Sequence, residues 1–335
     1  MRILVDMVHP ADVNFYKKAL YSLKKDGHEI LITVLDRGRL IDFVREEYPD
    51  FIIFPLGKHM SGKFGKILGI IEREWAFYRF FMWHRFERVT SFGFYPAIAA
   101  SFFKIKSITF HDDFEYKLNF KLCKMFATKF VIPDSIPVFG KNIVKYHGFK
   151  ELSYLYNFKP KKAVLKEYGV KENKYIFVRD IAKISLNYKD MEEADFSEVF
   201  KMLKKKKIDI LYFPEDASKA AKYAKYVKEL KAPIKDFHSL LYYAAFCLSS
   251  GDTVAREAAL LGTPVIYTGN RKMAVNSELV AINAIIETED SATIAEKAEI
   301  ILKKKMKATL RKKITAKKKS WDDTSDVIVR EILNG

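Results

Sequence analysis

Residues 247–264 read Cys247-Leu248-Ser249-Ser250-Gly251-Asp252-Thr253-Val254-Ala255-Arg256-Glu257-Ala258-Ala259-Leu260-Leu261-Gly262-Thr263-Pro264. A buried strand is predicted to end at Ser249, where a turn of small residues opens a helix with Asp252 or Thr253 as its N-cap. Gly262 ends this helix, and Pro264 begins the next strand. This order of strand, turn, helix and strand is typical of a parallel α/β sheet.

The same alternation extends along the whole chain. Strands are predicted at residues 2–8, 29–35, 51–55, 89–93, 107–110, 129–132, 174–179, 208–213, 244–249, 264–267 and 284–286. Helical patterns occupy residues 13–25, 40–47, 63–87, 97–103, 194–204, 218–230, 253–261 and 293–303. Residues 140–160 are rich in turn formers and indicate a connection between domains. We therefore expect an α/β protein of two Rossmann-like, doubly wound parallel-sheet domains, residues 1–145 and 146–318, which face a central cleft. A helix in residues 319–335 is expected to pack back on the first domain.

The composition excludes several classes of protein. Apolar residues make up 49% of the chain and aromatic residues 14%, which is enough for two cores and excludes a disordered or collagen-like chain. Two cysteines, Cys123 and Cys247, exclude a disulfide scaffold and a cysteine-rich zinc site. No run of 18 uncharged apolar residues occurs, and Asp6 interrupts the first apolar run where a signal peptide would continue. A cytoplasmic protein is expected.

The net charge of +17 is unevenly distributed. Residues 303–319 hold nine lysines and one arginine with no acid. Such a run either forms a solvated face or meets an anionic partner, and lysine enrichment with only 14 glycines resembles the composition of hyperthermophile proteins. Because no zinc finger, RNP pattern or KH loop is present, nucleic-acid binding is not predicted.

The turn before the helix at 253–261 is a candidate phosphate site. Backbone N–H groups at the positive end of a helix suit an anion, and Glu257, one turn further on, can accept hydrogen bonds from a ribose. The alternative is an ordinary strand–turn–helix with a capping side chain.

These residues resemble the nucleotide-sugar site of two-domain GT-B proteins, namely UDP-N-acetylglucosamine 2-epimerases and the lipid-linked N-acetylglucosaminyltransferase of peptidoglycan synthesis. Nearly the whole chain resembles an archaeal and bacterial family of unknown function (domain of unknown function 354). The matching pieces are Asp6 with His9-Pro10, Gly27-His28-Glu29, Thr109-Phe110-His111-Asp112-Asp113, Gly148-Phe149-Lys150-Glu151, Phe177-Val178-Arg179 and residues 256–264. The relatives usually carry consecutive glycines where this chain has Ser250-Gly251-Asp252, and an aspartate there would repel a diphosphate unless it caps the helix or faces away.

The resemblance implies a role for each matching residue. The diphosphate is expected on the turn formed by Ser249, Ser250, Gly251, Asp252 and Thr253, and the ribose on Glu257. Arg179 suits the β-phosphate, or else forms an interdomain salt bridge. Asn270 follows the next strand, either near the sugar and phosphates or as plain surface.

The first domain is expected to supply the catalytic groups. His111, Asp112 and Asp113 end one strand, and a histidine beside carboxylates can act as a general base; in the epimerases a His-Glu pair sits here. The alternative is that Asp112 or Asp113 caps the following helix. His9 touches either the ligand or the other domain. The acceptor side is expected to include Asn14, Gly93 and Glu151. No residues have metal-ligand spacing, and no cofactor is expected besides the UDP-sugar substrate.

The segment 61–90 contains eight aromatic residues and six Lys or Arg. One stripe (Ile67, Ile70, Ile71, Tyr78, Phe81 and Met82) is expected to cover the sheet. Phe77, Phe80 and Trp83 form a second face near Arg73, Arg79, Arg85 and Arg88, which suits peripheral contact with the inner face of a membrane. A homodimer interface or a thicker core is the alternative.

Taken together, the sequence predicts a metal-independent GT-B glycosyltransferase that moves a sugar from a UDP-type donor to a glycan or lipid-linked acceptor. The alternatives are a UDP-N-acetylhexosamine 2-epimerase-like isomerase or hydrolase and a non-catalytic protein that binds nucleotide sugars or glycans.

Overall fold

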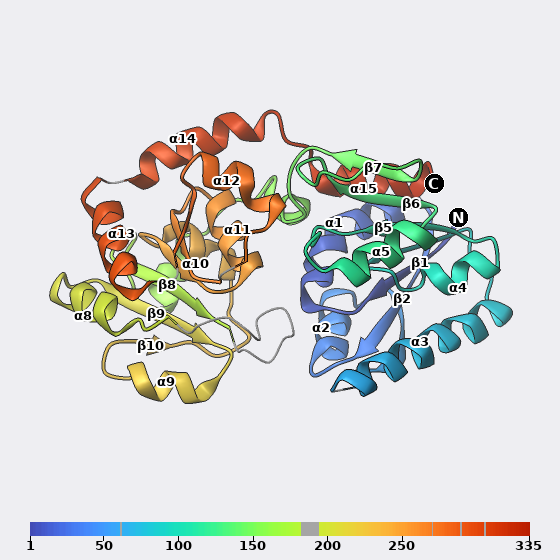
Figure 1. Cartoon of the computed structure of the whole chain (residues 1–335), viewed down its shortest axis with the longest axis horizontal. Helices are drawn as coiled ribbons and strands as arrows, with labels where there is room; N and C mark the ends of the chain where they lie inside the picture. Colours follow the sequence, from blue (N-terminus) through green and yellow to red (C-terminus); the bar gives the residue numbers. More distant parts are fainter. Residues whose placement is uncertain (61, 182–193, 270, 289, 305) are drawn as a thin grey trace. The chain divides into compact units, whose positions relative to one another are not determined.

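A computed structural model describes residues 1–335 except 61, 182–193, 270, 289 and 305. The chain forms two compact units (Figure 1). Unit 1 comprises Met1–Tyr156 and Trp321–Gly335, and unit 2 comprises Asn157–Ser320. The first unit thus extends beyond the predicted boundary at residue 145, because residues 140–160 are not a plain connection. They contain a strand, β7 (Ile143–Tyr146), and a short helix, α6 (Leu152–Leu155).

Within the described residues, unit 1 holds a seven-stranded parallel sheet in the order β3-β2-β1-β4-β5-β6-β7. Its other strands are β1 (Arg2–Met7), β2 (Glu29–Asp36), β3 (Ile52–Lys58), β4 (Arg88–Phe92), β5 (Lys106–Phe110) and β6 (Lys129–Pro133). The order reverses between β1 and β4, whose carboxyl ends are where ligands of such sheets bind.

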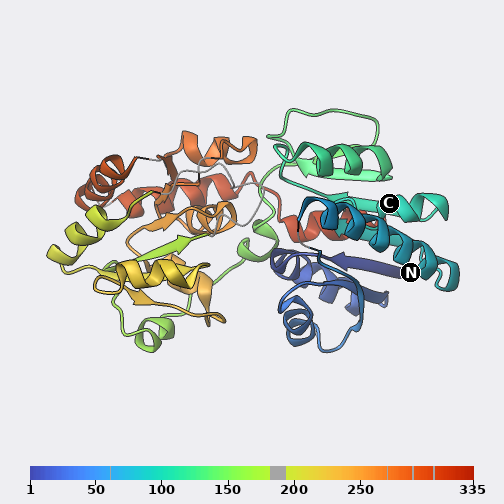
Figure 2. The ribbon, with the colours of Figure 1, turned by 60° about the horizontal axis from the view of Figure 1, so that its bottom comes forward.

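Helices cover both faces of this sheet. One core contains Ile3 and Val5 with α1 (Pro10–Lys25), α2 (Leu40–Glu47) and α15 (Thr324–Leu333). Leu4 points to the other face, toward α3 (Lys63–Trp83) and α4 (Ala97–Phe102), and α5 (Lys117–Phe126) packs near Phe130. In Figure 2 the red C-terminal helix lies among the blue and green elements of unit 1.

Unit 2 repeats the design with six parallel strands among its described residues, in the order β10-β9-β8-β11-β12-β13. The strands are β8 (Tyr175–Asp180), β9 (Asp209–Pro214), β10 (Lys228–Glu229), β11 (Cys247–Ser249), β12 (Val265–Tyr267) and β13 (Ile285–Glu287). The helical elements are α7 (Ala163–Glu167), α8 (Ser197–Lys205), α9 (Ala217–Tyr223), α10 (Phe237–Tyr243), α11 (Asp252–Leu260), η2 (Ala274–Asn276), α12 (Ser277–Ala281), α13 (Ser291–Lys304) and α14 (Met306–Lys318). The helix predicted at 218–230 was wrong in its second half, which contains β10.

The buried face of α3 also differs from the prediction. Phe81 is buried as predicted, and so is Phe77, which was expected on the second face. Ile67, Ile71 and Met82, expected to cover the sheet, are more than half exposed. Arg73 lies on the buried face because it forms an ion pair with Asp6 of β1 at 2.7 Å. Thr33 also donates a hydrogen bond to Asp6, at 2.8 Å, so this buried charge has both an ionic and a hydrogen-bonding partner.

Candidate functional site

The turn after β11 lies at the point where the strand order of unit 2 reverses. The register places Ser249 between Arg179 of β8 and Tyr267 of β12. The Ser249 hydroxyl donates to the Gly251 carbonyl at 2.8 Å and accepts from the Gly251 N–H at 3.1 Å. The Ser250 N–H donates to the Arg179 carbonyl at 3.0 Å. The turn therefore uses the amides of Ser250 and Gly251 for its own structure, and amides for an anion must come from the helix that follows.

The predicted N-cap of α11 was wrong, since Gly251 occupies that position and Asp252 is the first helical residue. The Asp252 carboxylate instead accepts a hydrogen bond from the Tyr267 hydroxyl and pairs with Arg271 at 2.5 Å. Arg271 therefore compensates the negative charge of Asp252. The N–H groups of Thr253 and Val254 belong to the first turn, where the helix itself offers no acceptor and its dipole is positive.

Glu257 lies one turn into α11 and is buried. Its Oε1 is 3.1 Å from Nε2 of His238, which α10 supplies. His238 was not predicted from the sequence, because it lies outside every motif and precedes its partner by 19 residues. The pair fixes the direction of the Glu257 side chain.

Arg179 lies beside the turn. A Cβ atom added to Gly251 would be 3.7 Å from Arg179 Cγ. The Arg179 guanidinium donates to the Phe213 carbonyl at 3.2 Å, lies over the Phe213 ring and pairs with Glu215. These partners all belong to unit 2. Asn270, the other predicted ligand, lies outside the described residues.

At the carboxyl edge of unit 1, His111 directly follows β5 and is buried. Its Nδ1 accepts a hydrogen bond from the Asp113 N–H at 3.0 Å, so a neutral ring carries its proton on Nε2. Burial lowers the pKa of His111, against the opposing effects of Asp112 and Asp113, which favours this neutral form. Among the described residues no group makes a hydrogen bond of ordinary geometry to Nε2, although the Asn119 amide is near enough to favour protonation. His111 is thus arranged as a hydrogen-bond donor rather than a base.

The two neighbouring aspartates differ. Asp112 is buried and pairs with Lys150 at 3.1 Å, and Lys150 Nζ lies 4.9 Å from the centre of the Phe92 ring. Asp113 accepts from the Tyr116 N–H at 3.2 Å in the turn before α5, and the N-cap of that helix is Tyr116 rather than either aspartate. Lys150 was not predicted as a site residue, because it is 38 residues from Asp112.

His9 is the N-cap of α1 and accepts from the Ala11 N–H at 3.2 Å. Asp12 completes the cap by accepting from the N–H groups of Val8 and His9, at 2.9 and 2.8 Å. The exposed His9 ring is therefore held in place by the first turn of α1.

The three residues predicted for the acceptor side have separate surroundings. Asn14 is half-buried on α1, and Glu151 is buried where α6 begins. Gly93 has a φ of 130°, a conformation that favours glycine, and its N–H donates to the Phe110 carbonyl at 3.0 Å. Across the described part of the chain, no three His, Cys, Asp or Glu side chains are grouped so that they could hold a metal ion.

The model of a family described as "Protein of unknown function (DUF354)" matches residues 1–335. The chain belongs to this family. An uncharacterised protein of Methanocaldococcus jannaschii is 23% identical to this DUF354 protein over 327 residues, which cover 91% of this chain and 92% of the relative.

Solved structures show which fold the DUF354 chain shares. UDP-GlcNAc 2-epimerase of M. jannaschii, in complex with UDP-GlcNAc and UDP, has a TM-score of 0.71 at 15% identity, with full coverage of both chains. MurG of Acinetobacter baumannii has a TM-score of 0.61 at 11% identity, also with full coverage of both chains. The DUF354 protein therefore has the predicted GT-B-like fold of two parallel-sheet domains, and at these identities the likeness shows the fold alone.

The structure gathers the predicted residues of this DUF354 protein into two groups. In unit 2, Ser249, Ser250, Gly251, Asp252, Thr253 and Glu257 surround the start of α11, with Arg179 beside them. In unit 1, His111, Asp112 and Asp113 follow β5, and the predicted residues His9 and Asn14 lie at the start of α1. His238 and Lys150 complete the groups as the two residues that sequence reasoning missed.

Proposed function

We propose that this DUF354 protein is a glycosyltransferase that transfers a sugar from a UDP-type donor to a glycan or lipid-linked acceptor. The observation that carries the proposal is the start of α11, where first-turn amides and a fixed carboxylate occur together. Thr253 and Glu257 are four residues apart, so they share one helix face with a rise of about 6 Å between them. That spacing suits a phosphate at the helix terminus and a ribose at the carboxylate.

The surroundings of the turn support an anionic donor. The aspartate that would repel a diphosphate is paired with Arg271, so its charge does not stand uncompensated near the first-turn amides. The aliphatic part of the Arg179 side chain lies beside Gly251, and we assign its guanidinium, which pairs with Glu215, to the departing diphosphate.

In the proposed reaction, unit 1 supplies the groups that act on the acceptor. The Asp112 carboxylate accepts the proton of the attacking hydroxyl, and Lys150 holds this carboxylate in place. His111 donates a hydrogen bond from Nε2 to orient the acceptor. The acceptor oxygen forms a bond to the anomeric carbon, and the bond from that carbon to UDP breaks, with UDP taking the electron pair.

Thermal melting with UDP tests the donor site. We expect UDP to raise the melting temperature of the wild-type protein, and Glu257→Gln to weaken UDP binding about 10- to 100-fold, because a hydrogen bond to a charged group is lost. Glu299→Gln, a half-exposed acid of α13, is the matched control and should bind UDP like the wild type. If neither UDP nor a UDP-sugar shifts the melting temperature, the proposal is wrong.

A UDP-N-acetylhexosamine 2-epimerase is the second candidate. One support is the grouping of His111 with two aspartates, because epimerisation at C2 needs proton donors and acceptors. The other is that a UDP-GlcNAc 2-epimerase has a similar fold. Incubation with UDP-GlcNAc in deuterated water separates the candidates. Deuterium at C2 and the appearance of the epimer support the epimerase. UDP release that depends on a polyprenyl-diphosphate-linked sugar, without deuterium at C2, supports the transferase.

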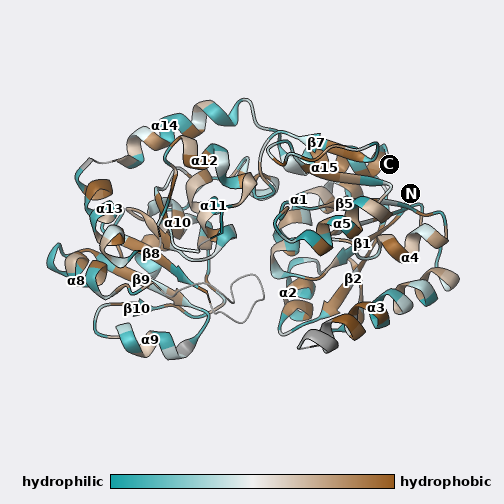
Figure 3. Cartoon of the chain, in the orientation of Figure 1, coloured by the Kyte–Doolittle hydropathy of each residue, from teal (hydrophilic) through white to brown (hydrophobic). Residues whose placement is uncertain are grey.

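We also propose that α3 touches a membrane surface. No helix within the described residues is long and apolar enough to cross a bilayer. However, α3 exposes an apolar stripe, defined as Ile67, Leu68, Ile71, Trp75, Met82 and Trp83, each 53–81% exposed. Figure 3 shows brown, hydrophobic segments along this helix. Arg79 and Arg85 are exposed as well, which suits the phosphates of anionic lipids.

Co-sedimentation with phosphatidylglycerol vesicles tests this contact. We expect binding that exceeds binding to phosphatidylcholine vesicles, and its loss in the double variant Ile71→Ser/Trp75→Ser. Met125→Ser, a similarly exposed position on α5, is the matched control and should leave binding intact. A change of oligomeric state in the double variant without any difference in vesicle binding would identify the stripe as a dimer interface and contradict the membrane proposal.

A further inference from the structure

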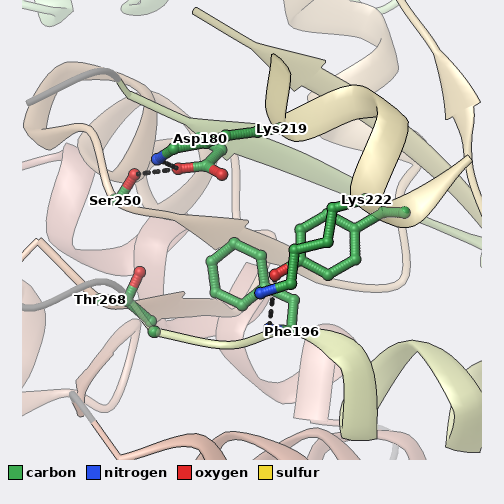
Figure 4. A pocket seen from close by; sticks show the side chains of 8 residues that line it. Asp180, Phe196, Lys219, Lys222, Ser250 and Thr268 are labelled. Carbon is green, nitrogen blue, oxygen red and sulfur yellow. Dashed lines mark hydrogen bonds and ion pairs between the residues drawn. The ribbon is translucent and has the colours of Figure 1, made fainter. Parts of the chain in front are cut away.

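Unit 2 contains a cavity of about 50 Å³ beside the Ser249–Gly251 turn. Figure 4 shows the side chains that line it, among them Asp180, Phe196, Lys219, Lys222, Ser250 and Thr268. A water molecule occupies about 30 Å³ of the liquid, and a cavity measured in this way needs only about 10–15 Å³ to hold one. The cavity therefore has room for more than a single water.

This cavity and the Glu257 site lie on opposite faces of the sheet. Phe177 of β8 packs against Phe237 of α10, the helix that supplies His238. Successive residues of a strand point to opposite faces, so Ile176 and Val178 pack with α8, α9 and α13 instead. Asp180 shares their face, where it contacts Lys219 of the α9 helix. The cavity is therefore separated from the Glu257 carboxylate by the sheet of unit 2.

Thr268 gives the strongest indication that the cavity holds a ligand. Its side chain is buried, and among the described residues nothing forms a hydrogen bond with its Oγ1. In Figure 4 this hydroxyl points toward the side where Ser250 and Asp180 lie. A buried hydroxyl without a partner is costly, and native structures rarely keep one unless a water or a ligand completes it.

Ser250 offers a second hydroxyl. Its Oγ accepts from the Ile181 N–H at 2.9 Å, whereas the acceptors nearest to its own hydrogen, the Arg179 carbonyl and Asp180 Oδ1, are each 3.5 Å away. At that distance a hydrogen bond between hydroxyl and oxygen is weak. The Ser250 hydroxyl can thus donate to a group in the cavity at little cost.

The charges around the cavity favour an anion. Among the described residues that line it, Lys219 and Lys222 are cations and Asp180 is the one acid, so the charges of these three side chains sum to +1. Asp180 pairs with Lys219 at 3.1 Å and accepts a hydrogen bond from the Tyr212 hydroxyl at 2.8 Å. Both oxygens of the Asp180 carboxylate thus already have partners within the protein. Lys222 also contacts Asp195 at 3.1 Å, but both side chains are about half exposed, so this pair is easily exchanged.

We propose that this cavity binds a phosphoryl group. The ionised oxygens of a phosphate accept hydrogen bonds, and the Thr268 and Ser250 hydroxyls and the two lysines supply donors for them. The site shares Ser250 with the turn of the proposed nucleotide site, but it lies on the other face of the sheet from Glu257. Its ligand is either free phosphate or the phosphate of a larger metabolite.

Inorganic phosphate is the probe for the test, with the full chain at low ionic strength. We expect saturable binding, observed by ³¹P line broadening and by a rise in melting temperature that equivalent chloride does not produce. Thr268→Val and Lys222→Met should each weaken phosphate binding at least tenfold, whereas Thr268→Ser should retain it. Lys201→Met, an exposed lysine of α8, is the matched control and should bind phosphate like the wild type.

Three results would overturn the proposal: no saturable binding to the wild type, wild-type affinity in Thr268→Val, or an equal loss in Lys201→Met. Glu257→Gln separates this site from the proposed function, because it should impair UDP binding and leave phosphate binding unchanged. Competition identifies the source of the phosphoryl group. Displacement of phosphate by UDP indicates a nucleotide phosphate, and simultaneous binding indicates a free anion.

Discussion

Gly269 follows β12, and the space around it excludes any side chain. A Cβ atom there would lie 2.5 Å from the Ser250 carbonyl oxygen and closer still to the Tyr267 ring and hydroxyl. We expect Gly269→Ala to displace the turn and to weaken UDP binding at least tenfold, measured by calorimetry. Gly140→Ala is the control, because its nearest contacts are an ordinary 3.4 Å. Unchanged UDP affinity in Gly269→Ala would show that the turn does not carry the nucleotide.

At the same scale, sequence reasoning found the site residues of each motif but not the pairs that distant residues form with them. The small residues of the turn and Glu257 are contiguous, and strand-to-helix patterning is enough to place them. His238 and Lys150 reach their partners from 19 and 38 residues away, and only the tertiary fold brings them together. Asp252 was recognised as a charge near the turn, but its pairing with Arg271 depends on a loop whose course has no periodic signal.

At the scale of elements, most strands and helices follow from hydrophobic periodicity. The exceptions have physical reasons. β10 is two residues long at a sheet edge, too short for an alternating pattern. α3 has two apolar faces, so its periodicity could not show which one is covered. The covered face of α3 also carries Arg73, which forms an ion pair with Asp6. Sequence patterning does not predict this, because arginine is mostly found at protein surfaces.

Glu74 links α3 to α4, since its carboxylate accepts from the Ala99 N–H at 3.1 Å. Burial raises the pKa of Glu74 to about 8. The folded protein therefore keeps the proton of Glu74 up to about pH 8, whereas the unfolded chain releases it near pH 4.5. The protonated carboxyl contributes fully to the free energy of unfolding below pH 4.5, and this contribution is lost as pH rises through 8. We expect Glu74→Gln, which keeps an acceptor for Ala99, to remove this loss and to be more stable than the wild type at pH 8 by about 1–3 kcal/mol.

Urea unfolding between pH 4.5 and 8.5 measures the effect of Glu74→Gln. Glu72→Gln, two residues earlier and exposed on the same helix, should retain the pH dependence of the wild type. A parallel pH dependence in Glu74→Gln and the wild type would mean that Glu74 is ionised in the folded protein.

At the scale of the whole molecule, the two units have separate hydrophobic cores, and the end of the chain belongs to the first. Ile328 of α15 is fully buried in the core that contains α1 and α2, whereas Ile301 of α13 is buried in the core of unit 2. The fold thus makes the stability of unit 1 depend on residues that follow unit 2 in the sequence.

Substitution in each core tests this division. We expect Ile328→Ala to cost about 2–5 kcal/mol through lost burial and a cavity, and to speed hydrogen exchange in unit 1. Unit 2 should keep its protection and, if the proposed donor site is correct, its affinity for UDP. Ile301→Ala is the reciprocal control and should speed exchange in unit 2 instead. Equal loss of protection in both units from either variant would show that they unfold as one cooperative body, and the assignment of α15 to a separately stable unit would fail.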